Sequence, residues 1–284
     1  MNGQEMRFFM LLFALFSTFF GACVGSFLNV CIYRIPRDES VVRPRSHCPK
    51  CGTLIPWYLN IPVLSWLALR GRCATCRGTI SFRYTLVELL TAMLFLAVFM
   101  KWAAPTAMRM PPIPHPLVIP VYWLFLSGLI LGTFVDFEHL IIPDSVTIGG
   151  MAAGPVLSAL IPIMHGRTMW WQGLQSSLIG LVVGFGLLYA VAWIGTKIFK
   201  KEAMGFGDVK LMGAIGAFLG WQSVLFTIFA SSLLGSICGL AMIALGQAKM
   251  QSRIPFGPYI SVAAAIWLFW GQSILNFYVG LMAR

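Results

Sequence analysis

Residues 203–213 read AMGFGDVKLMG, a short segment in which Asp208 lies between two glycines and a lysine. Apolar sequence follows directly on its C-terminal side. A carboxylate at the edge of a membrane span costs free energy, so an acid in this position is a functional candidate. We expect Gly205 and Gly207 to allow backbone conformations closed to other residues, and to let another segment approach closely.

A second acid, Asp136, has a similar setting, because it ends the apolar run in LGTFVDFEHLIIPD. Two such carboxylates on separate segments favour an aspartyl protease. Mutual repulsion and desolvation would leave one ionised to activate water and one protonated to donate to the scissile carbonyl. Two readings compete with this: helix-end acids at a water interface, and an ion-coupled transporter in which Asp136 and Asp208 bind a proton or cation at the bilayer midplane.

The composition indicates a polytopic membrane protein. Of 284 residues, 58% are hydrophobic and 10% are charged, whereas soluble domains carry roughly a quarter charged residues. The mean hydropathy is +0.83. The net charge of +11 is dispersed between apolar runs rather than gathered on one face. It therefore indicates cytoplasmic loops, and we expect no nucleic-acid partner.

Apolar runs predict an all-α bundle of about eight transmembrane helices, since about 20 residues cross a bilayer. The first run is too long for a signal peptide and lacks a cleavage site. Gly21 and Gly25 within it form a G-x-x-x-G, which predicts close helix packing. The sixth run is too short to cross the bilayer comfortably without help from its flanking residues. The runs are 8–32, 85–100, 117–135, 145–164, 174–198, 209–219, 224–245 and 259–282.

Loop charges predict the orientation. The polar region 33–83 carries nine cations, which by the positive-inside rule makes it cytoplasmic and puts the N-terminus outside. Alternating the spans then assigns fourteen loop cations to the inside and five to the outside. Asp136 and Asp208 fall at the same, cytoplasmic, membrane edge.

Two C-x-x-C pairs about twenty residues apart have the spacing of a four-thiolate zinc site. Disulfides are the alternative, but thiols stay reduced in the cytosol, which favours a structural zinc. The predicted organisation is a first span (1–33), a zinc-binding cytosolic loop (34–84) and a membrane peptidase domain (85–284). Cys23, Cys31 and Cys238 are expected to be packing residues. The zinc ligands are Cys48, Cys51, Cys73 and Cys76.

Other charged residues have less specific settings. Asp144 follows Pro143 and begins a span, which predicts an N-cap. Lys210 could hold a substrate carbonyl, steady the charge of Asp208, or snorkel to the interface. The four histidines are expected to be solvated or interfacial, and no serine or cysteine forms a nucleophile motif with them.

Seven ordered blocks resemble the type IV prepilin peptidases, bifunctional membrane enzymes that cleave prepilin leaders and N-methylate the new N-terminus. The blocks are GSFLNVCIYRIPR (25–37), the pairs CPKC and CATC, NIPVLSWLALRGRC (60–73), RYTLVELLT (83–91), DFEHLIIPD (136–144), GFGDVKLMG (205–213) and IPFGPY (254–259). The resemblance implies Asp136 and Asp208 as the catalytic pair, with Gly205, Gly207 and Lys210 in support.

The resemblance also implies cofactors, partners and a location. The methyl donor would be S-adenosylmethionine, used by the N-terminal cytosolic region, where Glu88 and Gly71 are candidate binding residues. Glu88 could instead form a salt bridge to Arg83 or Arg34. Substrates would be prepilins or pseudopilins, whose apolar helix enters from the lipid of a bacterial inner membrane. Acids near the site would attract the basic leader: Glu138, Asp144 and Glu202.

Overall fold

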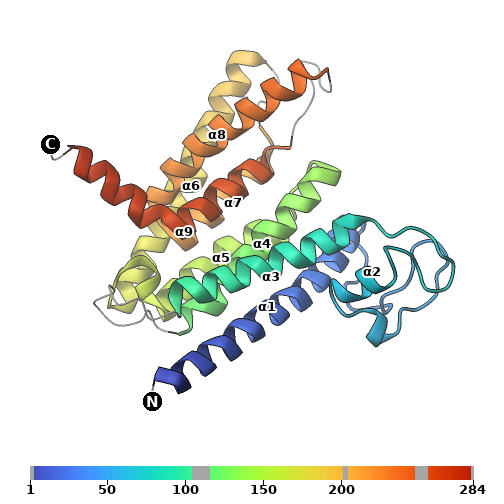
Figure 1. Cartoon of the computed structure of the whole chain (residues 1–284). Helices are drawn as coiled ribbons and strands as arrows, with labels where there is room; N and C mark the ends of the chain where they lie inside the picture. Colours follow the sequence, from blue (N-terminus) through green and yellow to red (C-terminus); the bar gives the residue numbers. More distant parts are fainter. Residues whose placement is uncertain (1–2, 104–115, 201–203, 247–254, 283–284) are drawn as a thin grey trace. The chain divides into compact units, whose positions relative to one another are not determined.

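The computed structural model describes residues 3–103, 116–200, 204–246 and 255–282 (Figure 1). Within these ranges the chain is helical and has no β-strand, as the apolar runs predicted. The α-helices are α1 (Gly3–Arg34), α2 (Leu64–Ala68), α3 (Phe82–Trp102), α4 (Val118–His139), α5 (Asp144–Leu160), α6 (Trp170–Phe199), α7 (Phe206–Leu219), α8 (Trp221–Ala244) and α9 (Gly257–Met282). Short 3₁₀ turns are η1 (Ile35–Arg37), η2 (Trp57–Leu59) and η3 (Pro162–His165).

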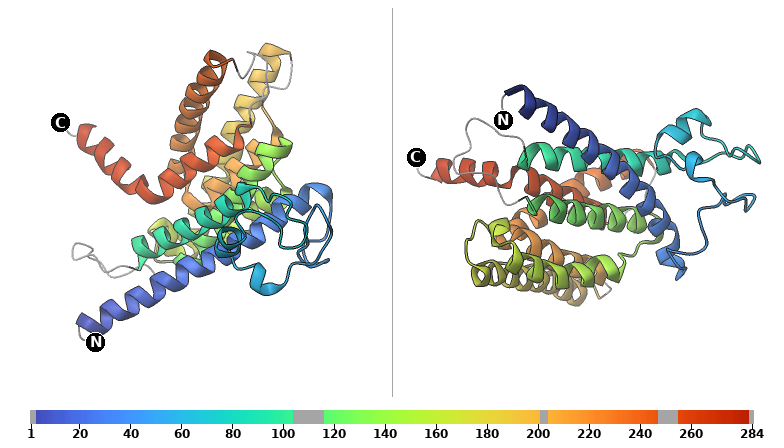
Figure 2. Two further views of the ribbon diagram at one scale, coloured as in Figure 1. Left: turned by 45° about the vertical axis from the view of Figure 1, so that its right-hand side comes forward. Right: turned by 90° about the horizontal axis from the view of Figure 1, so that it is seen from below.

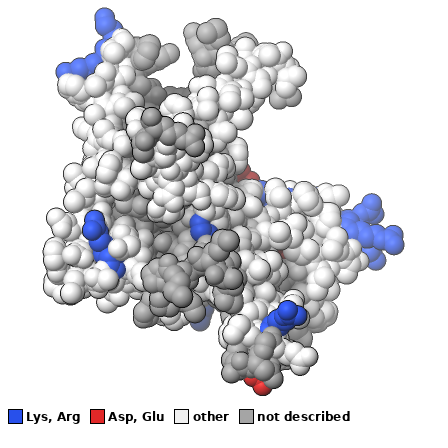
Figure 3. All heavy atoms as spheres, turned by 60° about the vertical axis from the view of Figure 1, so that its left-hand side comes forward, with Lys and Arg blue, Asp and Glu red and all other residues white. Residues whose placement is uncertain are grey.

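Six of the described helices are long and apolar enough to cross a membrane: α1, α3, α4, α6, α8 and α9. The predicted count of about eight is not confirmed. Helix α5 has 17 residues and α7 has 14, and at about 1.5 Å per residue both are shorter than the roughly 30 Å hydrocarbon core. The chain is nonetheless a multi-pass membrane protein. Most of the described surface on the face drawn in Figure 3 is uncharged.

The chain divides into two compact units, residues 1–131 and 132–284, and α4 crosses the division. In the first unit, α1 and α3 run antiparallel and side by side (Figure 1). A Cβ added at Gly21 would lie 2.9 Å from Ala92 Cα, and one at Gly25 would lie 2.7 Å from Glu88 Cα. The G-x-x-x-G prediction of close packing is therefore confirmed.

The segment between α1 and α3 is a compact insertion that contains η1, η2, α2 and both C-x-x-C pairs. Both views in Figure 2 show it, coloured blue to cyan, at one end of the α1–α3 pair. Arg34, the last residue of α1, is buried and donates hydrogen bonds to the carbonyls of Ser40 (2.9 Å) and Pro44 (2.8 Å). These bonds fix the path of the chain as it leaves the helix.

The second unit is built around α7, whose residues from Asp208 to Phe218 are all buried except Lys210. Small residues on its neighbours let the backbones touch: a Cβ at Gly180 of α6 would lie 2.0 Å from the Gly216 oxygen, and one at Gly154 of α5 would lie 2.6 Å from Ala217 Cβ. Because α7 is enclosed by protein, it does not need the length of a lipid-exposed span.

The turns at the far end of α7 are fixed by a half-buried histidine. His165 Nε2 lies 2.9 Å from Ser158 Oγ, and the ring also hydrogen-bonds the backbone of Ala217. Burial lowers the pKa of His165 to about 4. The expectation that all four histidines are solvated or interfacial is not confirmed for His165, whose half-buried ring joins the ends of α5 and α7.

Candidate functional site

Asp136 lies in the last turn of α4 and is only 5% exposed. Its Oδ2 accepts a hydrogen bond of 2.9 Å from the backbone N–H of Gly257. Gly257 is the first residue of α9, and the N-terminus of a helix carries a partial positive charge. The carboxyl group of Asp136 thus accepts a hydrogen bond from Gly257 and faces the partial positive charge at the N-terminus of α9.

Asp208 is the third residue of α7 and is 8% exposed. Its position at the start of the helix follows from GFGD, in which Gly205 is the N-cap and its carbonyl accepts the Asp208 N–H at 3.2 Å. Among the described residues, none donates a hydrogen bond to the Asp208 carboxyl group. Its environment therefore differs from that of Asp136.

The fold brings the two carboxyl groups together within the second unit, where the charge of Asp136 acts on Asp208. Ile142, in the turn before α5, fills the space beside them. A Cβ at Gly207 would lie 3.3 Å from Ile142 Cβ, and one at Gly257 would lie 3.1 Å from Ile142 Cδ1. The ends of α4 and the starts of α5, α7 and α9 thus meet at one place.

Only part of what was expected of the two glycines in the G-x-G-D segment is confirmed. Gly205 has φ −66° and ψ 138°, which any residue can adopt, so the expectation of a special backbone conformation is wrong there. A Cβ at Gly205 would make an ordinary contact of 3.4 Å with Asp208 Oδ2. Close approach does hold at Gly207, where Ile142 leaves little room for a side chain.

Lys210 forms an ion pair with Asp144 Oδ1, and its ammonium group lies 5.5 Å from the centre of the Phe206 ring. Asp144 is the first residue of α5, and the N-cap is Pro143 without a side-chain cap. The predicted capping bond is therefore wrong. The Asp144 carboxylate instead accepts from Thr147 Oγ1 (3.4 Å) and ties α5 to α7 through Lys210.

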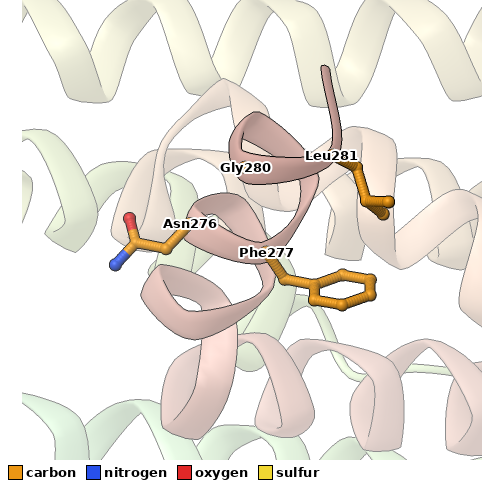
Figure 4. A pocket seen from close by; sticks show the side chains of 4 residues that line it. All are labelled: Asn276, Phe277, Gly280 and Leu281. Atoms are coloured by element: carbon orange, nitrogen blue, oxygen red, sulfur yellow. The ribbon is translucent and has the colours of Figure 1, made fainter. Parts of the chain in front are cut away.

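The remaining acids predicted near the site are Glu138 and Glu202. Glu138 is exposed in the last turn of α4, whereas Glu202 lies outside the described residues. A hollow on the last turns of α9 is lined by Asn276, Phe277, Gly280 and Leu281 (Figure 4). Asn276 is about 28 Å along the helix from Gly257, so this hollow is separate from the aspartates.

The four predicted zinc ligands form one cluster in the first unit. Their sulfur atoms all lie within 4.8 Å of one another, and Cys48 Sγ is 3.9 Å from Cys76 Sγ. Sulfurs about 3.8 Å apart are what a tetrahedral ion with Zn–S bonds of about 2.3 Å requires. All seven cysteines are free thiols, so the disulfide alternative is not supported, and the cluster could hold a zinc ion.

Both C-x-x-C segments have the same local geometry. The N–H of each leading cysteine donates across the turn, Cys48 to Thr53 (2.9 Å) and Cys73 to Gly78 (2.8 Å). The Thr53 hydroxyl and then its backbone N–H lower the pKa of Cys51 to about 6. Two such turns present their sulfurs to one point, as the spacing predicted.

Glu88 is buried in α3, where its Oε2 accepts a hydrogen bond of 2.7 Å from the Val63 N–H. Ser26 of α1 also hydrogen-bonds it. Val63 has φ 62° and ψ −51°, and the Leu64 N–H donates to the Pro62 carbonyl at 2.6 Å. This is a classic γ-turn, a strained conformation. Glu88 therefore holds a strained turn of the insertion, and the alternative salt bridge to Arg34 is not formed.

Gly71 follows α2 by three residues and has φ +67°. A Cβ added there would lie 2.8 Å from Trp66 Cζ2. The conformation and the contact both require glycine. Trp66 in turn donates from Nε1 to the Ile80 carbonyl (3.3 Å). Gly71 thus has a structural role in packing this tryptophan.

Sequence reasoning did not assign a role to Gly257, although the IPFGPY block contains it. The signal that could have found it is a glycine at the start of a predicted span, where helix N–H groups lack intrahelical acceptors. The contact with Asp136 joins positions far apart in the chain, so composition alone could not reveal it.

These features define a class, the multi-pass helical membrane proteins with a buried pair of carboxyl groups. The bacterial peptidase A24 N-terminal domain matches residues 19–102, and the type IV leader peptidase family matches residues 123–240. The chain belongs to the type IV leader peptidase family. No solved structure matches it.

Several curated relatives carry the name prepilin leader peptidase/N-methyltransferase. One from Myxococcus xanthus is 40% identical over 85% of this chain and 67% of its own length. One from Aeromonas hydrophila is 35% identical over 98% of this chain and 96% of its own, and one from Pseudomonas aeruginosa is 33% identical over 95% and 94%. The transporter alternative has no support from these relatives.

Proposed function

We propose that this protein is an inner-membrane enzyme that cleaves the leader peptide of prepilin-like substrates and N-methylates the new N-terminal residue. Its relatives carry the name of both activities. The observation that carries the peptidase assignment is the meeting of the buried Asp136 and Asp208 carboxyl groups at the ends of separate helices.

In the proposed mechanism, Asp136 is the ionised member of the pair and Asp208 is the protonated one. The Gly257 N–H and the start of α9 favour a negative charge on Asp136. Asp208 lacks a hydrogen-bond donor among the described residues and faces the charge of Asp136, so a proton on Asp208 relieves the repulsion. The protons belong to the pair as a whole.

During cleavage each carboxyl group gives up one proton and receives one proton. Asp136 takes a proton from a water molecule, and the water oxygen attacks the scissile carbonyl carbon. At the same time Asp208 donates its proton to the carbonyl oxygen. When the tetrahedral diol collapses, the C–N bond breaks, the proton on Asp136 passes to the leaving amine and a diol proton returns to Asp208. The pair regains its starting state.

Three further groups support the pair in this proposal. Gly257 orients Asp136 through its N–H, and Ile142 excludes water from one side. The ion pair between Lys210 and Asp144 joins the starts of α7 and α5, which hold Asp208 and Ile142. Lys210 therefore acts through Asp144 as a positioning residue.

Methyl transfer needs a site for S-adenosylmethionine, and the first unit offers polar groups that suit one. Asn29 Nδ2 donates to the Tyr84 carbonyl (2.9 Å), but Asn29 Oδ1 and Thr85 Oγ1 are buried without a hydrogen-bond partner among the described residues. The amino group and hydroxyls of the cofactor are donors for such acceptors. We assign Asn29, Thr85 and Glu88 to this site, where the cofactor supplies a sulfonium methyl group.

The four cysteines would hold a structural zinc ion, since four thiolates leave no open position for water. The zinc would join the two C-x-x-C turns and stabilise an insertion too small for a large core. Methylation is assigned to the cytosolic loop, residues 34–84, with Glu88 as a candidate cofactor residue, and peptidase activity is assigned to residues 85–284. The aspartates are assigned to the cytosolic membrane face, where exposed Glu138 would attract a basic leader.

The experiment is an assay of the full-length enzyme in detergent or nanodiscs with a prepilin and S-adenosylmethionine. Mass spectrometry should show a product shortened by the leader and carrying one added methyl group. Uncleaved substrate with an enzyme that keeps its fold would contradict the proposal. Cleavage without methylation would leave the peptidase assignment intact and reject the methyltransferase assignment.

A further inference from the structure

The insertion between α1 and α3 carries mainly positive charge. Its two acids, Asp38 and Glu39, come directly after η1, and residues 40–87 contain no aspartate or glutamate. Six cations of this segment are exposed, and none of them forms an ion pair in the described part of the chain. Such a surface has a positive potential that attracts anions. The six are Arg43, Arg45, Lys50, Arg70, Arg72 and Arg77.

The same insertion exposes large apolar side chains outside any candidate span. Trp57 is 75% exposed and Tyr58 is 56% exposed, and their rings lie 5.9 Å apart in a T-shaped pair. Leu64 and Leu67 are exposed one turn apart on α2, which puts them on one side of that helix. Aromatic rings of this kind are typical of the headgroup level of membranes.

Both ends of the insertion are tied to one end of the α1–α3 pair. The order of contacts shows the antiparallel packing: Phe13 stacks on Phe99 (6.5 Å between ring centres), whereas Asn29 bonds the Tyr84 carbonyl. Because α1 and α3 are both long enough to cross a bilayer, the chain leaves and re-enters the membrane at the same surface. The insertion cannot move far from that surface.

We propose that the insertion docks on the membrane surface, with Trp57, Tyr58, Leu64 and Leu67 in the interface and the exposed cations on anionic phospholipid headgroups. The positive charge of the insertion favours an anionic lipid surface as its binding partner, since exposed cations and aromatic rings together match such a surface. A basic leader peptide has the same sign as the insertion and would be repelled. The inference concerns lipid binding and does not depend on the assignment of the catalytic pair.

The test uses full-length protein in nanodiscs of phosphatidylcholine alone and of phosphatidylcholine with phosphatidylglycerol. Hydrogen–deuterium exchange of peptides from residues 41–81 should slow several-fold when phosphatidylglycerol is present, and high salt should reverse much of this protection. Brominated lipids should quench the fluorescence of wild-type protein more than that of a Trp57→Phe variant. Zinc content reports whether the insertion remains folded.

A matched pair of variants isolates the cations. Arg43→Gln/Arg45→Gln should lose protection in the anionic nanodiscs, whereas Arg7→Gln/Arg167→Gln, which changes two exposed cations outside the insertion, should keep it. If Arg43→Gln/Arg45→Gln loses zinc, the salt dependence and Trp57 quenching of the wild type decide instead. Equal exchange in both nanodiscs without Trp57 quenching would overturn the proposal. Protection that appears only on adding a prepilin would also overturn it, and would assign the surface to protein.

Discussion

The backbone N–H of Gly257 donates a hydrogen bond of 2.9 Å to Asp136 Oδ2, and so joins the start of α9 to the end of α4. A hydrogen bond from a helix N-terminus stabilises a carboxylate and fixes its orientation. The second carboxyl group, Asp208, comes from α7. The proposed peptidase site thus depends on three helix ends that are remote from one another in the chain.

Replacing either aspartate should stop cleavage. Asp136→Asn and Asp208→Asn should each lower the rate of leader cleavage by at least about 100-fold, because neither acid can do the other's proton transfer. Asp144→Asn is the control. It weakens the ion pair with Lys210, in which Asp144 is 62% exposed. A partly exposed pair contributes about 0–1 kcal/mol, so the loss of positioning should be small and most activity should remain. Substantial cleavage by Asp136→Asn would reject the two-carboxylate mechanism. Methyl transfer is a separate readout, and Asp208→Asn should still methylate a pre-cut peptide.

Gly257→Ala should impair cleavage without unfolding the protein. The added Cβ would lie 2.8 Å from Asp136 Oδ2 and would displace that carboxyl group, and a shift of about 1 Å at a reacting group can cost about 100-fold in rate. The loss should appear in kcat rather than KM. Gly280→Ala is the matched control on the same helix, since nothing lies within 4 Å of its added Cβ. Equal activity of both variants would show that the contact does not orient Asp136.

Purified protein should contain about one zinc ion per chain, held by the four-cysteine cluster. Elemental analysis should show its loss in a Cys73→Ser/Cys76→Ser variant, with faster proteolysis of the insertion because the metal joins its two turns. Cys238→Ser, which changes an exposed cysteine outside the cluster, should retain the metal. Metal-free wild type with disulfides, prepared without oxidation, would reject both the zinc and the cytosolic placement.

Gly180→Ala should destabilise the second unit strongly. Its added Cβ would lie 2.0 Å from the Gly216 carbonyl oxygen, so α6 and α7 must separate. Overpacking of this kind costs about 1–3 kcal/mol or more, measured by thermal unfolding in detergent. Gly186→Ala on the same helix meets nothing within 4 Å and should be neutral or stabilising by up to about 1 kcal/mol. Similar unfolding temperatures for the two variants would contradict the backbone contact.

The half-buried His165 should make the protein less stable in acid. Its pKa is about 4 in the folded protein and about 6.5 when unfolded, so the unfolded chain binds the proton more readily. The contribution is complete above about pH 6.5 and is lost as the pH falls toward 4, by up to roughly 3 kcal/mol. Subtracting the unfolding profile of His165→Gln from that of the wild type should isolate this slope. Parallel profiles between pH 7 and 4 would show that His165 does not lose its preference for the neutral form on unfolding.

Some features could be predicted from the sequence because they depend on residues close together in the chain. The six long apolar helices follow from hydropathy summed over consecutive residues, and the cysteine cluster follows from two local C-x-x-C turns. Motif order identified the family. The count of about eight spans is not confirmed, because hydropathy alone does not show whether the short runs 145–164 and 209–219, which form α5 and α7, cross the bilayer.

The sequence by itself thus determined the membrane class, the family, the candidate metal ligands and the two acids to examine. Only the tertiary structure decided that Asp136 and Asp208 meet, that Gly257 binds one of them, and that Asp144 pairs with Lys210 rather than capping a helix. These relationships depend on packing between distant segments, where small residues set how closely backbones approach. Local composition does not show which distant segments pack together, so the geometry of the site could be seen only in the folded structure.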